Sequence, residues 1–417
     1  MTVGFDVTWM DKDNKSGGVY QYAFRLISAI VEHTDTNVVA ITGPTGKGIF
    51  EPLKKYKNFK EVPFGPPNSL LDIVKSDNID VVHTPIQNLI NFTLSVPMII
   101  TLHDLQHYYY PEFFTADEIK FRDFFYKLSA EFAERVIVSF QHAKEDIVRF
   151  YGIPAEKIDV CPLGTVSPKP IDNNKFQVIR EKYKIPERYI FYSANTWRHK
   201  NHVSLIRALK ILHEKYDLKI SLICTGRQYP DYYPQILGEV NKLNLKDFVN
   251  FTGYIPEDDV KTLLKNSTLA VIPTLYEAGS FPLMEAMAYE VPVICSNVTS
   301  LPDTIRDKRF IFDPKDIEQI AEKAATLLKD EKLVQENREN SRIRVREGGW
   351  DKTVHMFLNV YSKAVEEFNK AKDIKALKNR MQIYESVSKG DLDALRNSYS
   401  WKITAPIRAV AAFLKKR

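Results

Sequence analysis

The sequence is poor in cysteine and has no apolar run long enough to cross a bilayer. Only three of its 417 residues are cysteine: Cys161, Cys224 and Cys295. Their spacing suits neither a disulfide framework nor a zinc site, and each lies in or beside an apolar run. We therefore expect buried free thiols in a reducing compartment. No apolar stretch approaches the ~20 residues of a membrane-spanning helix. No basic-then-apolar leader precedes the first apolar run, so we expect a cytoplasmic protein without a secretion signal.

Length and composition indicate a globular protein with two domains. A chain of 417 residues is too long for one core. Its composition of 44% hydrophobic and 27% charged residues is ordinary for a globular protein. The net charge of +5 is unevenly placed, because residues 370–417 contain 12 Lys and Arg against 4 Asp and Glu. The remainder carries −3, so the basic character belongs to the C-terminal tail.

Strand-like and helix-like patterns alternate along both halves, which predicts two doubly wound parallel sheets. The expected strands are Val3–Val7, Asp80–His83, Pro97–Leu102, Arg135–Phe140, Lys157–Pro162, Tyr189–Ser193, Lys219–Thr225, Phe248–Gly253, Leu269–Pro273 and Val291–Cys295. The expected helices include Val19–Val31, Gln141–Tyr151, Val203–Lys215, Ile317–Leu328, Lys332–Arg346 and Trp350–Lys370. The segment 162–186, rich in Pro, Gly, Asn and charge, marks a crossing between domains.

The stretch Thr274–Asp303 organises the second half. A buried strand leads into a polar, glycine-containing loop and then a helix near Pro282, with Ser280 as its expected N-cap. Such a unit presents unpaired backbone N–H groups at the carboxyl edge of a sheet, where anionic ligands bind. Glu277 and Glu285 frame it, and carboxylates accept hydrogen bonds from hydroxyls but repel phosphate. The pair therefore favours a ligand that carries hydroxyls as well as phosphates. Either acid alone is explained equally well by its favourable interaction with the helix dipole.

The run E-A-G-S-F-P-L-M-E, followed by A-M-A and a V-P-V-I strand, resembles the signature of retaining glycosyltransferases of family 4. This resemblance implies an α/β protein of the GT-B fold, with two doubly wound Rossmann-like domains facing a cleft. The expected domains are 1–165 on the acceptor side, 166–370 for the nucleotide sugar together with a crossover helix, and 371–417 as a basic amphipathic helical extension.

The same resemblance gives roles to the residues of the signature. It implies that Glu277 meets the transferred sugar as a catalytic residue and that Glu285 binds the ribose hydroxyls of the donor. The donor-binding loop and helix start between them comprise Gly279, Ser280, Phe281 and Pro282. The family often has G-F-G in this loop, so Ala278, Gly279 and Ser280 depart from its pattern and affect the fit of the donor sugar.

Two matches lie in the first half. In N-K-S-G-G-V-Y, Gly17 and Gly18 stand where the first strand passes into the first helix, and paired glycines let a backbone approach a ligand. The family has a G-G loop there, facing the donor diphosphate and acceptor. In T-L-H-D-L, the resemblance makes His103 the active-site histidine near the transferred sugar, with Asp104 orienting it. An ordinary turn and a packed histidine remain the alternatives, and His83 is expected to be structural.

Two further matches lie in the second half. In A-N-T-W-R-H-K-N-H, the resemblance implies that Lys200 contacts the donor diphosphate. The family's partner arginine would stand at Asn195, so we expect Arg198 to replace it, with solvated surface as the alternative for both cations. The turn G-Y-I-P places Tyr254 and Ile255 against the nucleobase, largely through backbone groups.

Two apparent ligand motifs are rejected. Gly43–Gly48 lacks the spacing and the final Ser or Thr of a phosphate-binding P-loop. Asp11-Lys12-Asp13 matches the D-x-D of metal-dependent transferases but lies in a charged loop, where such triplets occur by chance. We therefore expect no metal and no cofactor beyond the nucleotide sugar.

The C-terminal tail combines an apolar stripe with positive charge. Thr404 is the expected cap of a helix whose stripe is Ile407, Val410, Ala411 and Leu414. With Trp401 and the final Lys-Lys-Arg, this pattern is typical of a helix lying on an anionic membrane, or of one packed on the enzyme or a second subunit. Similar S-W-K/R-x-T-A-P-x-R endings occur in bacterial transferases that build surface polysaccharides.

Together these features predict a retaining, metal-independent hexosyltransferase of polysaccharide (O-antigen type) biosynthesis. It would move a sugar, with mannose as first candidate, from GDP-mannose or a UDP-sugar to a growing lipid-linked surface glycan at the inner face of the membrane. No side chain is placed as a covalent nucleophile, so we expect same-face attack assisted by the departing phosphate. No nucleic-acid partner is expected. The alternatives are a sugar-nucleotide epimerase of the GT-B fold and a non-catalytic glycan-binding scaffold.

Overall fold

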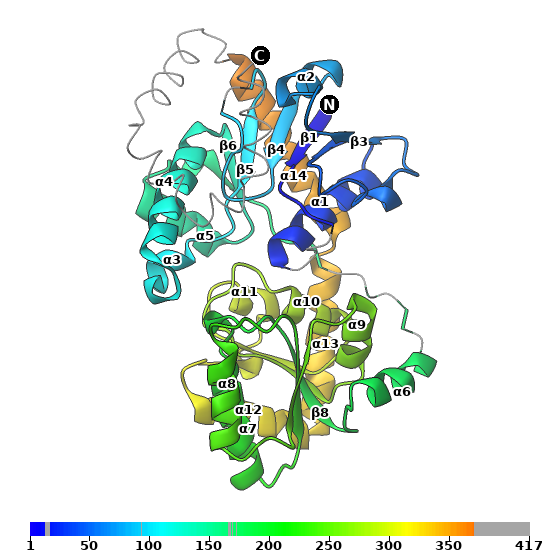
Figure 1. Cartoon of the computed structure of the whole chain (residues 1–417), viewed down its shortest axis with the longest axis vertical. Helices are drawn as coiled ribbons and strands as arrows, with labels where there is room; N and C mark the ends of the chain where they lie inside the picture. The colour runs from blue at the N-terminus through cyan, green and yellow to red at the C-terminus, as the bar shows by residue number, and fades with distance from the viewer. Residues whose placement is uncertain (13–16, 93, 166–167, 169, 172, 371–417) are drawn as a thin grey trace. The chain divides into compact units, whose positions relative to one another are not determined.

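The computed structural model describes residues 1–12, 17–92, 94–165, 168, 170–171 and 173–370 (Figure 1). The described chain divides into two compact units. Unit 1 contains Met1–Gly164 and Trp350–Lys370, whereas unit 2 is the continuous segment Thr165–Gly349. The expected basic amphipathic extension, 371–417, lies outside the described residues.

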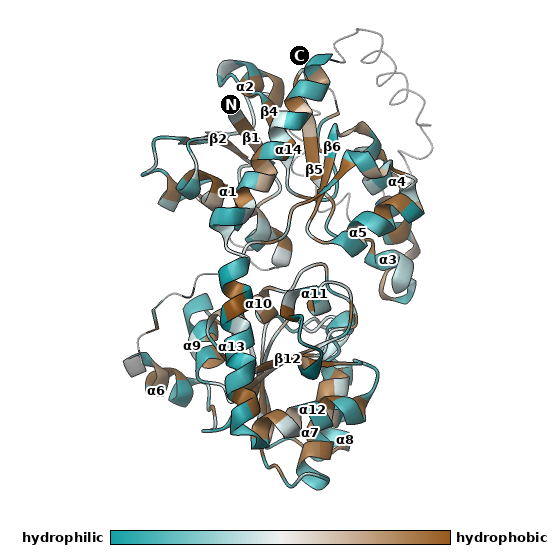
Figure 2. Ribbon diagram, turned by 180° about the vertical axis from the view of Figure 1, so that it is seen from behind, coloured by the Kyte–Doolittle hydropathy of each residue, from teal (hydrophilic) through white to brown (hydrophobic). Residues whose placement is uncertain are grey.

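Unit 1 is built on a seven-stranded sheet of order β3-β2-β1-β4-β5-β6-β7, in which every pair is parallel. The strands are β1 (Thr2–Val7), β2 (Asn37–Thr42), β3 (Phe59–Pro63), β4 (Val81–Thr84), β5 (Met98–Thr101), β6 (Arg135–Val138) and β7 (Ile158–Val160). All four residues of β4, β5 and β6 are buried, as expected for strands covered on both faces. Figure 2 shows the hydrophobic strand β5 in brown, while the helices mix brown and teal.

The helices of unit 1 include a segment that is distant in sequence. They are α1 (Gly18–His33), α2 (Leu70–Ser76), α3 (Gln106–Tyr109), α4 (Ala116–Phe132), α5 (Gln141–Asp146) and α14 (Trp350–Lys370). Helix α14 packs against α1, β4 and β5. It buries Val354, Phe357, Tyr361 and Ala364, whose helical spacing places them on one face. Fully burying one such apolar side chain contributes roughly 1.5–3 kcal/mol, so α14 is part of the core of unit 1.

Gly164 marks the point where the chain leaves unit 1. A Cβ atom added at Gly164 would lie 2.3 Å from Cγ and Cδ2 of Trp350, the first residue of α14. Only glycine lets the backbone pass this indole, so the exit from unit 1 and the return to it are packed against each other.

Unit 2 has a six-stranded parallel sheet of order β10-β9-β8-β11-β12-β13. Its strands are β8 (Tyr189–Ser193), β9 (Ser221–Thr225), β10 (Val249–Gly253), β11 (Leu269–Ile272), β12 (Val293–Ser296) and β13 (Ile311–Phe312). Its helices are α6 (Asn173–Lys182), α7 (His202–Glu214), α8 (Tyr233–Lys242), α9 (Glu257–Lys265), α10 (Phe281–Ala288), α11 (Leu301–Ile305), α12 (Ile317–Lys329) and α13 (Glu331–Glu347).

The segment 162–186, predicted as an interdomain crossing, contains helix α6. This helix packs on α9, and Ile179 and Ile185 are buried in the core of unit 2. The chain passes between the units at Gly164 and Thr165, and most of the Pro- and Asn-rich segment belongs to unit 2.

Each sheet has one point where the strand order reverses. In unit 1 it lies between β1 and β4, and in unit 2 it lies between β8 and β11. The loops that leave these strands at their carboxyl ends turn in opposite directions, which opens a ligand site at that edge. In unit 2 the two loops carry the Lys200 region and the Glu277 region.

Candidate active site

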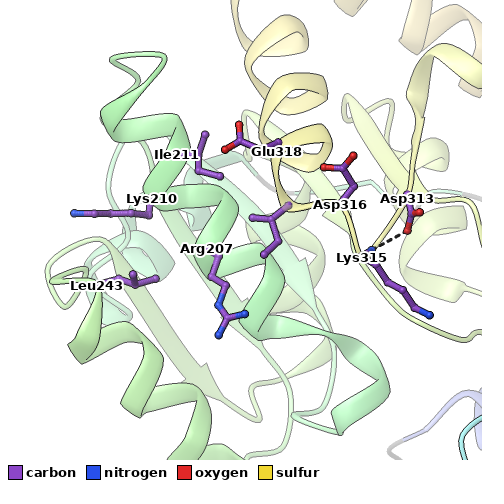
Figure 3. Close-up of a pocket in the computed structure, with 9 residues that line it drawn as sticks. Arg207, Lys210, Ile211, Leu243, Asp313, Lys315, Asp316 and Glu318 are labelled. Carbon is purple, nitrogen blue, oxygen red and sulfur yellow. Dashed lines mark hydrogen bonds between the residues drawn. The ribbon is translucent and has the colours of Figure 1, made fainter.

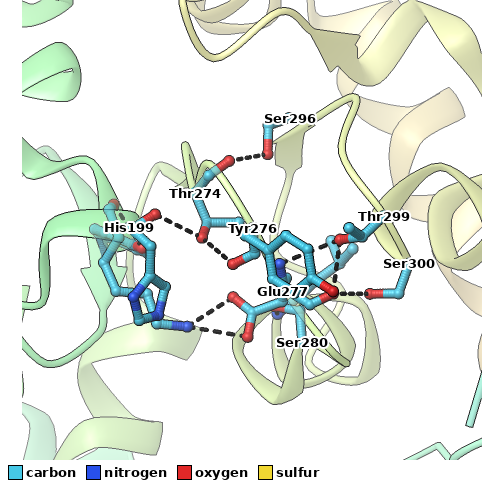
Figure 4. Close-up of polar contacts among 11 residues, drawn as sticks. His199, Thr274, Tyr276, Glu277, Ser280, Ser296, Thr299 and Ser300 are labelled. Atoms are coloured by element: carbon cyan, nitrogen blue, oxygen red, sulfur yellow. Dashed lines mark hydrogen bonds and ion pairs between the residues drawn. The ribbon is translucent and has the colours of Figure 1, made fainter. Parts of the chain in front are cut away.

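Lys200 and Glu277 meet where the strand order of unit 2 reverses. Lys200 Nζ donates to Glu277 Oε2 at 2.7 Å and to Oε1 at 3.0 Å (Figure 4). The two side chains are 13% and 12% exposed, so the pair is shielded from water but still reachable from solution. The loops after β8 and β11 therefore bring together the cation and the acid that the sequence places far apart.

The backbone around Glu277 is held by hydroxyl groups from the loop after β12 (Figure 4). Thr299 Oγ1 accepts from Glu277 N at 3.1 Å and donates to Glu277 O at 2.6 Å. Ser300 Oγ also donates to Glu277 O, at 3.2 Å. These bonds use the main chain of Glu277 and leave its carboxylate for Lys200 and a ligand.

A second set of bonds joins the Glu277 loop to the Lys200 loop. Leu275 N donates to His199 O at 2.7 Å, and Thr274 Oγ1 lies 2.9 Å from the same carbonyl oxygen. Ser296 Oγ donates to Thr274 O at 2.7 Å, which ties the end of β12 to the same loop (Figure 4). The Lys200–Glu277 pair thus rests on a hydrogen-bonded frame from three neighbouring loops.

Helix α10 begins as the sequence predicts. Ser280 is its N-cap, and its hydroxyl accepts from Leu283 N at 3.3 Å, while Pro282 occupies the first turn. Phe281 is buried and Gly279 lies in the partly exposed loop before it. Glu285 lies within α10 and is 9% exposed. The start of α10 offers backbone N–H groups and a positive helix end beside the two acids.

Asn201 is a site residue that the sequence analysis missed. It caps α7 in the left-handed conformation, with φ of 58°, and its amide donates to Pro273 O at 2.9 Å and to Pro314 O at 3.0 Å. One side chain therefore fixes the loop after β8, the end of β11 and the loop before α12. Its position directly after Lys200, and the tolerance of asparagine for positive φ, could have indicated this role.

Arg198 and Asn195 are engaged with other parts of unit 2. The Arg198 guanidinium lies 5.3 Å from the ring centroid of Tyr232, just before α8. Asn195 Oδ1 accepts from Arg227 N at 2.8 Å and so connects the loops after β8 and β9. Arg198 is exposed, so it can leave Tyr232 to reach an anion, and its replacement of the usual diphosphate arginine stays a prediction.

The turn after β10 presents one aromatic ring to solvent. Tyr254 is 62% exposed, and the Arg227 guanidinium lies 5.7 Å from its ring centroid. Ile255 is buried in the core of unit 2, so only its backbone is placed to meet a ligand. Arg227 is a third cation at this edge of the sheet, beside Arg198 and Lys200. Its place just after the carboxyl end of β9, directly after Gly226, is the sequence signal that could have identified it.

His103 lies just beyond the carboxyl end of β5 in unit 1 and is 8% exposed. Its Nε2 lies 3.2 Å from Pro85 O, and a carbonyl oxygen can only accept, so this nitrogen carries the proton. Burial lowers the pKa of His103 below its ordinary value of 6.5, against smaller raising effects of Pro85 O and Asp104. The neutral ring therefore keeps the Nδ1 lone pair as an acceptor.

The remaining predicted residues of unit 1 lie near this edge or support it. Gly17 has φ of +119°, which L side chains rarely adopt, and Gly18 begins α1. Asp104 Oδ1 accepts from Gln106 N at 3.1 Å, so its carboxylate caps the local turn. His83 is fully buried in β4, as its expected structural role requires.

A separate hollow of about 700 Å³ lies between α7 and the start of α12 (Figure 3). Arg207 and Lys210 line it, but they already pair with Glu239 at 2.7 Å and Glu214 at 2.9 Å. None of the predicted site residues lines this hollow.

The described residues contain neither a cluster suited to a metal ion nor a helix suited to crossing a membrane. In that part of the chain, no group of three or more His, Cys, Asp or Glu side chains is arranged to hold a metal ion. Asp13 of the rejected D-x-D triplet lies outside the described residues. Among the described helices, none combines the length and apolar character that crossing a membrane requires.

Two protein-family models match this chain, one in each half. The model for glycosyltransferase family 4 matches residues 16–166, and the model for glycosyl transferases group 1 matches residues 175–344. Together they cover more than half of the chain and one model falls on each unit. The chain belongs to glycosyltransferase family 4.

Several relatives of this family 4 transferase are mannosyltransferases by name. It is 24% identical over 266 residues to O-antigen chain mannosyltransferase B of Escherichia coli, covering 63% of this chain and 69% of that protein. It is 30% identical over 217 residues to O-antigen chain mannosyltransferase RfbU of Salmonella typhimurium, covering 52% and 57%. Across five such mannosyltransferases, the match spans 34% to 69% of the relative's own length.

Solved structures agree on the fold. Anabaena Alr3699/HepE in complex with UDP and glucose matches 87% of this chain and all of its own chain, with a TM-score of 0.67 and 17% identity. A glycosyltransferase from Rickettsia africae matches with the same TM-score over 98% of its chain at 18% identity. The family 4 transferase therefore has the GT-B fold, as the E-A-G-S-F-P-L-M-E signature predicted.

Proposed function

We propose that this family 4 enzyme is a retaining, metal-independent hexosyltransferase that moves a sugar from a nucleoside-diphosphate donor to a surface glycan. The observation that carries the proposal is the shielded Lys200–Glu277 pair beside the start of α10. A cation, a carboxylate and a helix N-terminus at one sheet edge suit a ligand that joins a diphosphate to a hydroxyl-rich sugar.

The donor would divide these groups between its parts. Lys200 binds the diphosphate, and the backbone N–H groups at Gly279–Pro282 add further donors. Glu277 accepts from hydroxyls of the transferred sugar, while Glu285, within α10, accepts from the ribose. Tyr254 and the backbone of Ile255 lie against the nucleobase. Gly17 and Gly18 of unit 1 approach the diphosphate and the acceptor.

The reaction would need no covalent nucleophile from the protein. The bond between the sugar C1 and the phosphate oxygen breaks, and the acceptor oxygen bonds to C1 on the same face. The acceptor proton passes to the departing phosphate oxygen. Lys200 stabilises the extra negative charge on the leaving diphosphate, which is the electrostatic contribution that a preorganised cation makes best. Neutral His103 offers its Nδ1 lone pair to a hydroxyl of the sugar.

Mannose is the first candidate for the transferred sugar, and GDP-mannose for the donor. The support is that the relatives in Escherichia coli and Salmonella typhimurium are named O-antigen mannosyltransferases. A UDP-sugar is the second candidate, because HepE was crystallised with UDP and glucose. The acceptor is proposed to be a lipid-linked glycan, approached at the membrane with the help of residues 371–417.

A thermal-shift screen followed by a nucleotide-release assay tests the proposal. A ligand that binds only the folded state raises the melting temperature. We expect GDP and GDP-mannose to raise it in the absence of divalent cations, and GDP-mannose to release GDP slowly to water and faster with a glycan acceptor. Stabilisation by no nucleoside diphosphate, or release that requires an added divalent cation, would contradict the proposal.

A further inference from the structure

Four buried side chains form a continuous hydrogen-bonded chain in unit 1. Tyr361 Oη lies 2.9 Å from His83 Nδ1, and His83 Nε2 lies 2.8 Å from Thr101 Oγ1. Thr101 Oγ1 in turn lies 2.9 Å from Tyr22 Oη. The four residues come from α14, β4, β5 and α1, and each is 0% or 1% exposed.

The chain ends against His103. The Tyr22 ring packs edge-on to the His103 ring, with the centroids 4.8 Å apart and an interplanar angle of 88°. Thr101 is the last residue of β5, directly before the Leu102–His103 turn. His103 is therefore fixed by Pro85 O on one side, by the Tyr22 ring on another, and by a backbone that leaves β5 at Thr101.

His83 couples its hydrogen bond to Tyr361 with its hydrogen bond to Thr101. Burial, with a smaller effect of His103, lowers the pKa of His83 to about 3, so its ring is neutral. A neutral imidazole has one donor and one acceptor nitrogen. If Nδ1 donates to Tyr361, then Nε2 must accept from Thr101, and Tyr22 must donate to Thr101. In the other direction Tyr361 donates to Nδ1 and Nε2 donates to Thr101, and Thr101 Oγ1 can then either donate to Tyr22 or accept from it. The two bonds of His83 therefore always reverse together.

We propose that His83, Thr101 and Tyr22 are positioning residues for His103, and that Tyr361 of α14 anchors them. The inference rests on the proposed function, in which His103 meets the transferred sugar. Thr101 holds the hydroxyl of Tyr22 by a hydrogen bond, and the Tyr22 ring fixed in this way packs on His103. A helix that follows unit 2 in sequence thereby contributes to the geometry of the active-site histidine.

If these four hydrogen-bonded side chains had only a structural role, they would hold α14 on the sheet without affecting His103. Thr101 separates the two roles because its hydroxyl is shared by the bonds to His83 and Tyr22. Thr101→Val keeps the shape and removes the hydroxyl, whereas Thr101→Ser keeps the hydroxyl. Tyr361→Phe breaks the chain at its far end. Tyr189→Phe is the matched control, since it removes an equally buried hydroxyl in unit 2, which donates to Leu263 O at 2.6 Å.

The experiment combines kinetics with a spectroscopic signature in the full chain. GDP release from GDP-mannose gives kcat and KM, and ¹⁵N NMR of labelled histidine reports the Nε2–H tautomer of His103, assigned by its loss in His103→Ala. For Thr101→Val we expect kcat to fall about tenfold with KM unchanged, because a misplaced catalytic group slows turnover more than binding. The His103 signal should become a mixture of tautomers. Thr101→Ser should restore both, Tyr361→Phe should show a smaller loss, and Tyr189→Phe should show none.

Two results would overturn the inference in different ways. If Thr101→Val lowers only the melting temperature and leaves kcat and the His103 signal unchanged, the chain is structural and the proposed function stands. If His103→Ala releases GDP as fast as the unaltered enzyme, the role of His103 itself fails and the positioning role fails with it. The imidazole signal needs no substrate, so it decides the inference even where GDP-mannose is not the donor.

Discussion

Lys200 Nζ lies 2.7 Å from Glu277 Oε2, so the cation proposed for the donor diphosphate is already paired with the acid proposed for the donor sugar. Each group satisfies the other at a site that is shielded from water. A bound diphosphate would compete with Glu277 for Lys200, and the freed carboxylate could then accept from sugar hydroxyls. We therefore propose that the pair couples binding of the diphosphate to binding of the sugar.

This coupling predicts opposite effects for Glu277→Gln on binding and on turnover. The amide no longer competes for Lys200, so GDP should bind at least as tightly as in the unaltered enzyme. Turnover should fall by about a hundredfold or more, because a charge that stabilises the transition state is lost. Isothermal titration with GDP and steady-state kinetics with GDP-mannose measure the two effects. Weaker GDP binding in this variant would contradict the coupling.

Glu285→Ala should act mainly on nucleotide binding. A hydrogen bond to a charged acceptor contributes about 1.5–3 kcal/mol, so GDP affinity should fall by about tenfold to a hundredfold. Glu277→Ala, in contrast, should mainly slow turnover. Comparing GDP with deoxy-GDP, which lacks the ribose 2′-hydroxyl, supplies the control, since the Glu285 variant should discriminate less between them. Equal losses of GDP affinity in the two alanine variants would refute this division of roles.

Removing the N-cap of α10 should destabilise unit 2. The Ser280 hydroxyl accepts from Leu283 N at 3.3 Å, and Ser280→Ala should lower the free energy of unfolding by about 1 kcal/mol. Ser280→Asp restores a capping acceptor and should recover most of that loss. The same aspartate adds negative charge where the diphosphate is proposed to bind, so it should weaken GDP binding. Urea unfolding and GDP titration of the two variants measure these effects, and an aspartate variant with unaltered GDP affinity would argue against a phosphate site at α10.

Gly164→Ala should destabilise unit 1 through a steric clash. Its new Cβ would lie 2.3 Å from the Trp350 indole, and overpacking of this kind costs about 1–3 kcal/mol or more. In the double variant with Trp350→Ala, the clash is removed, so the two losses should be strongly non-additive. Chemical unfolding of the single and double variants gives the coupling. Additive losses would mean that the two residues do not touch.

Acid should destabilise the enzyme through its buried histidines. Burial lowers the pKa of His202 from 6.5 to about 3 in the folded protein, whereas in the unfolded chain it returns to its ordinary value. The unfolded state therefore binds more protons between these values, and stability falls as the pH drops from about 6.5 towards 3. Each such histidine contributes a slope of about 1.4 kcal/mol per pH unit.

His202→Gln tests this pH dependence, because glutamine does not titrate. The free energy of unfolding, measured by urea at pH 7 and pH 5, should fall less over this interval in the variant than in the unaltered enzyme. If the variant and the unaltered enzyme lose the same free energy between the two pH values, the folded-state pKa of His202 is not lowered.

Much of the architecture follows from hydrophobic periodicity. The strand Tyr189–Ser193 and the helix Trp350–Lys370 are predicted to the residue, and helix α1 is predicted to within two residues at each end. These segments are long or strongly apolar, and their flanks contain turn residues. The predicted cap at Ser280 is likewise confirmed, because its signal is local.

Other elements could not be predicted from the sequence, because tertiary packing determines them. Strand β3, F-K-E-V-P, has only two buried residues and carries charge because it lies at the edge of its sheet. Helix α6 is hidden in a segment rich in Pro and Asn, and packing on α9 supports it. Asn201 and the chain from Tyr361 to Tyr22 join residues far apart in sequence, and no local pattern indicates such contacts.

The return of α14 to unit 1 has a consequence for synthesis on the ribosome. Thr165–Gly349 is one uninterrupted piece of chain, so it emerges and can fold as a whole. The amino-terminal piece emerges earlier but lacks Phe357 and Tyr361, which are fully buried in its finished interior. Its apolar surface therefore stays uncovered until unit 2 and helix α14 have left the exit tunnel.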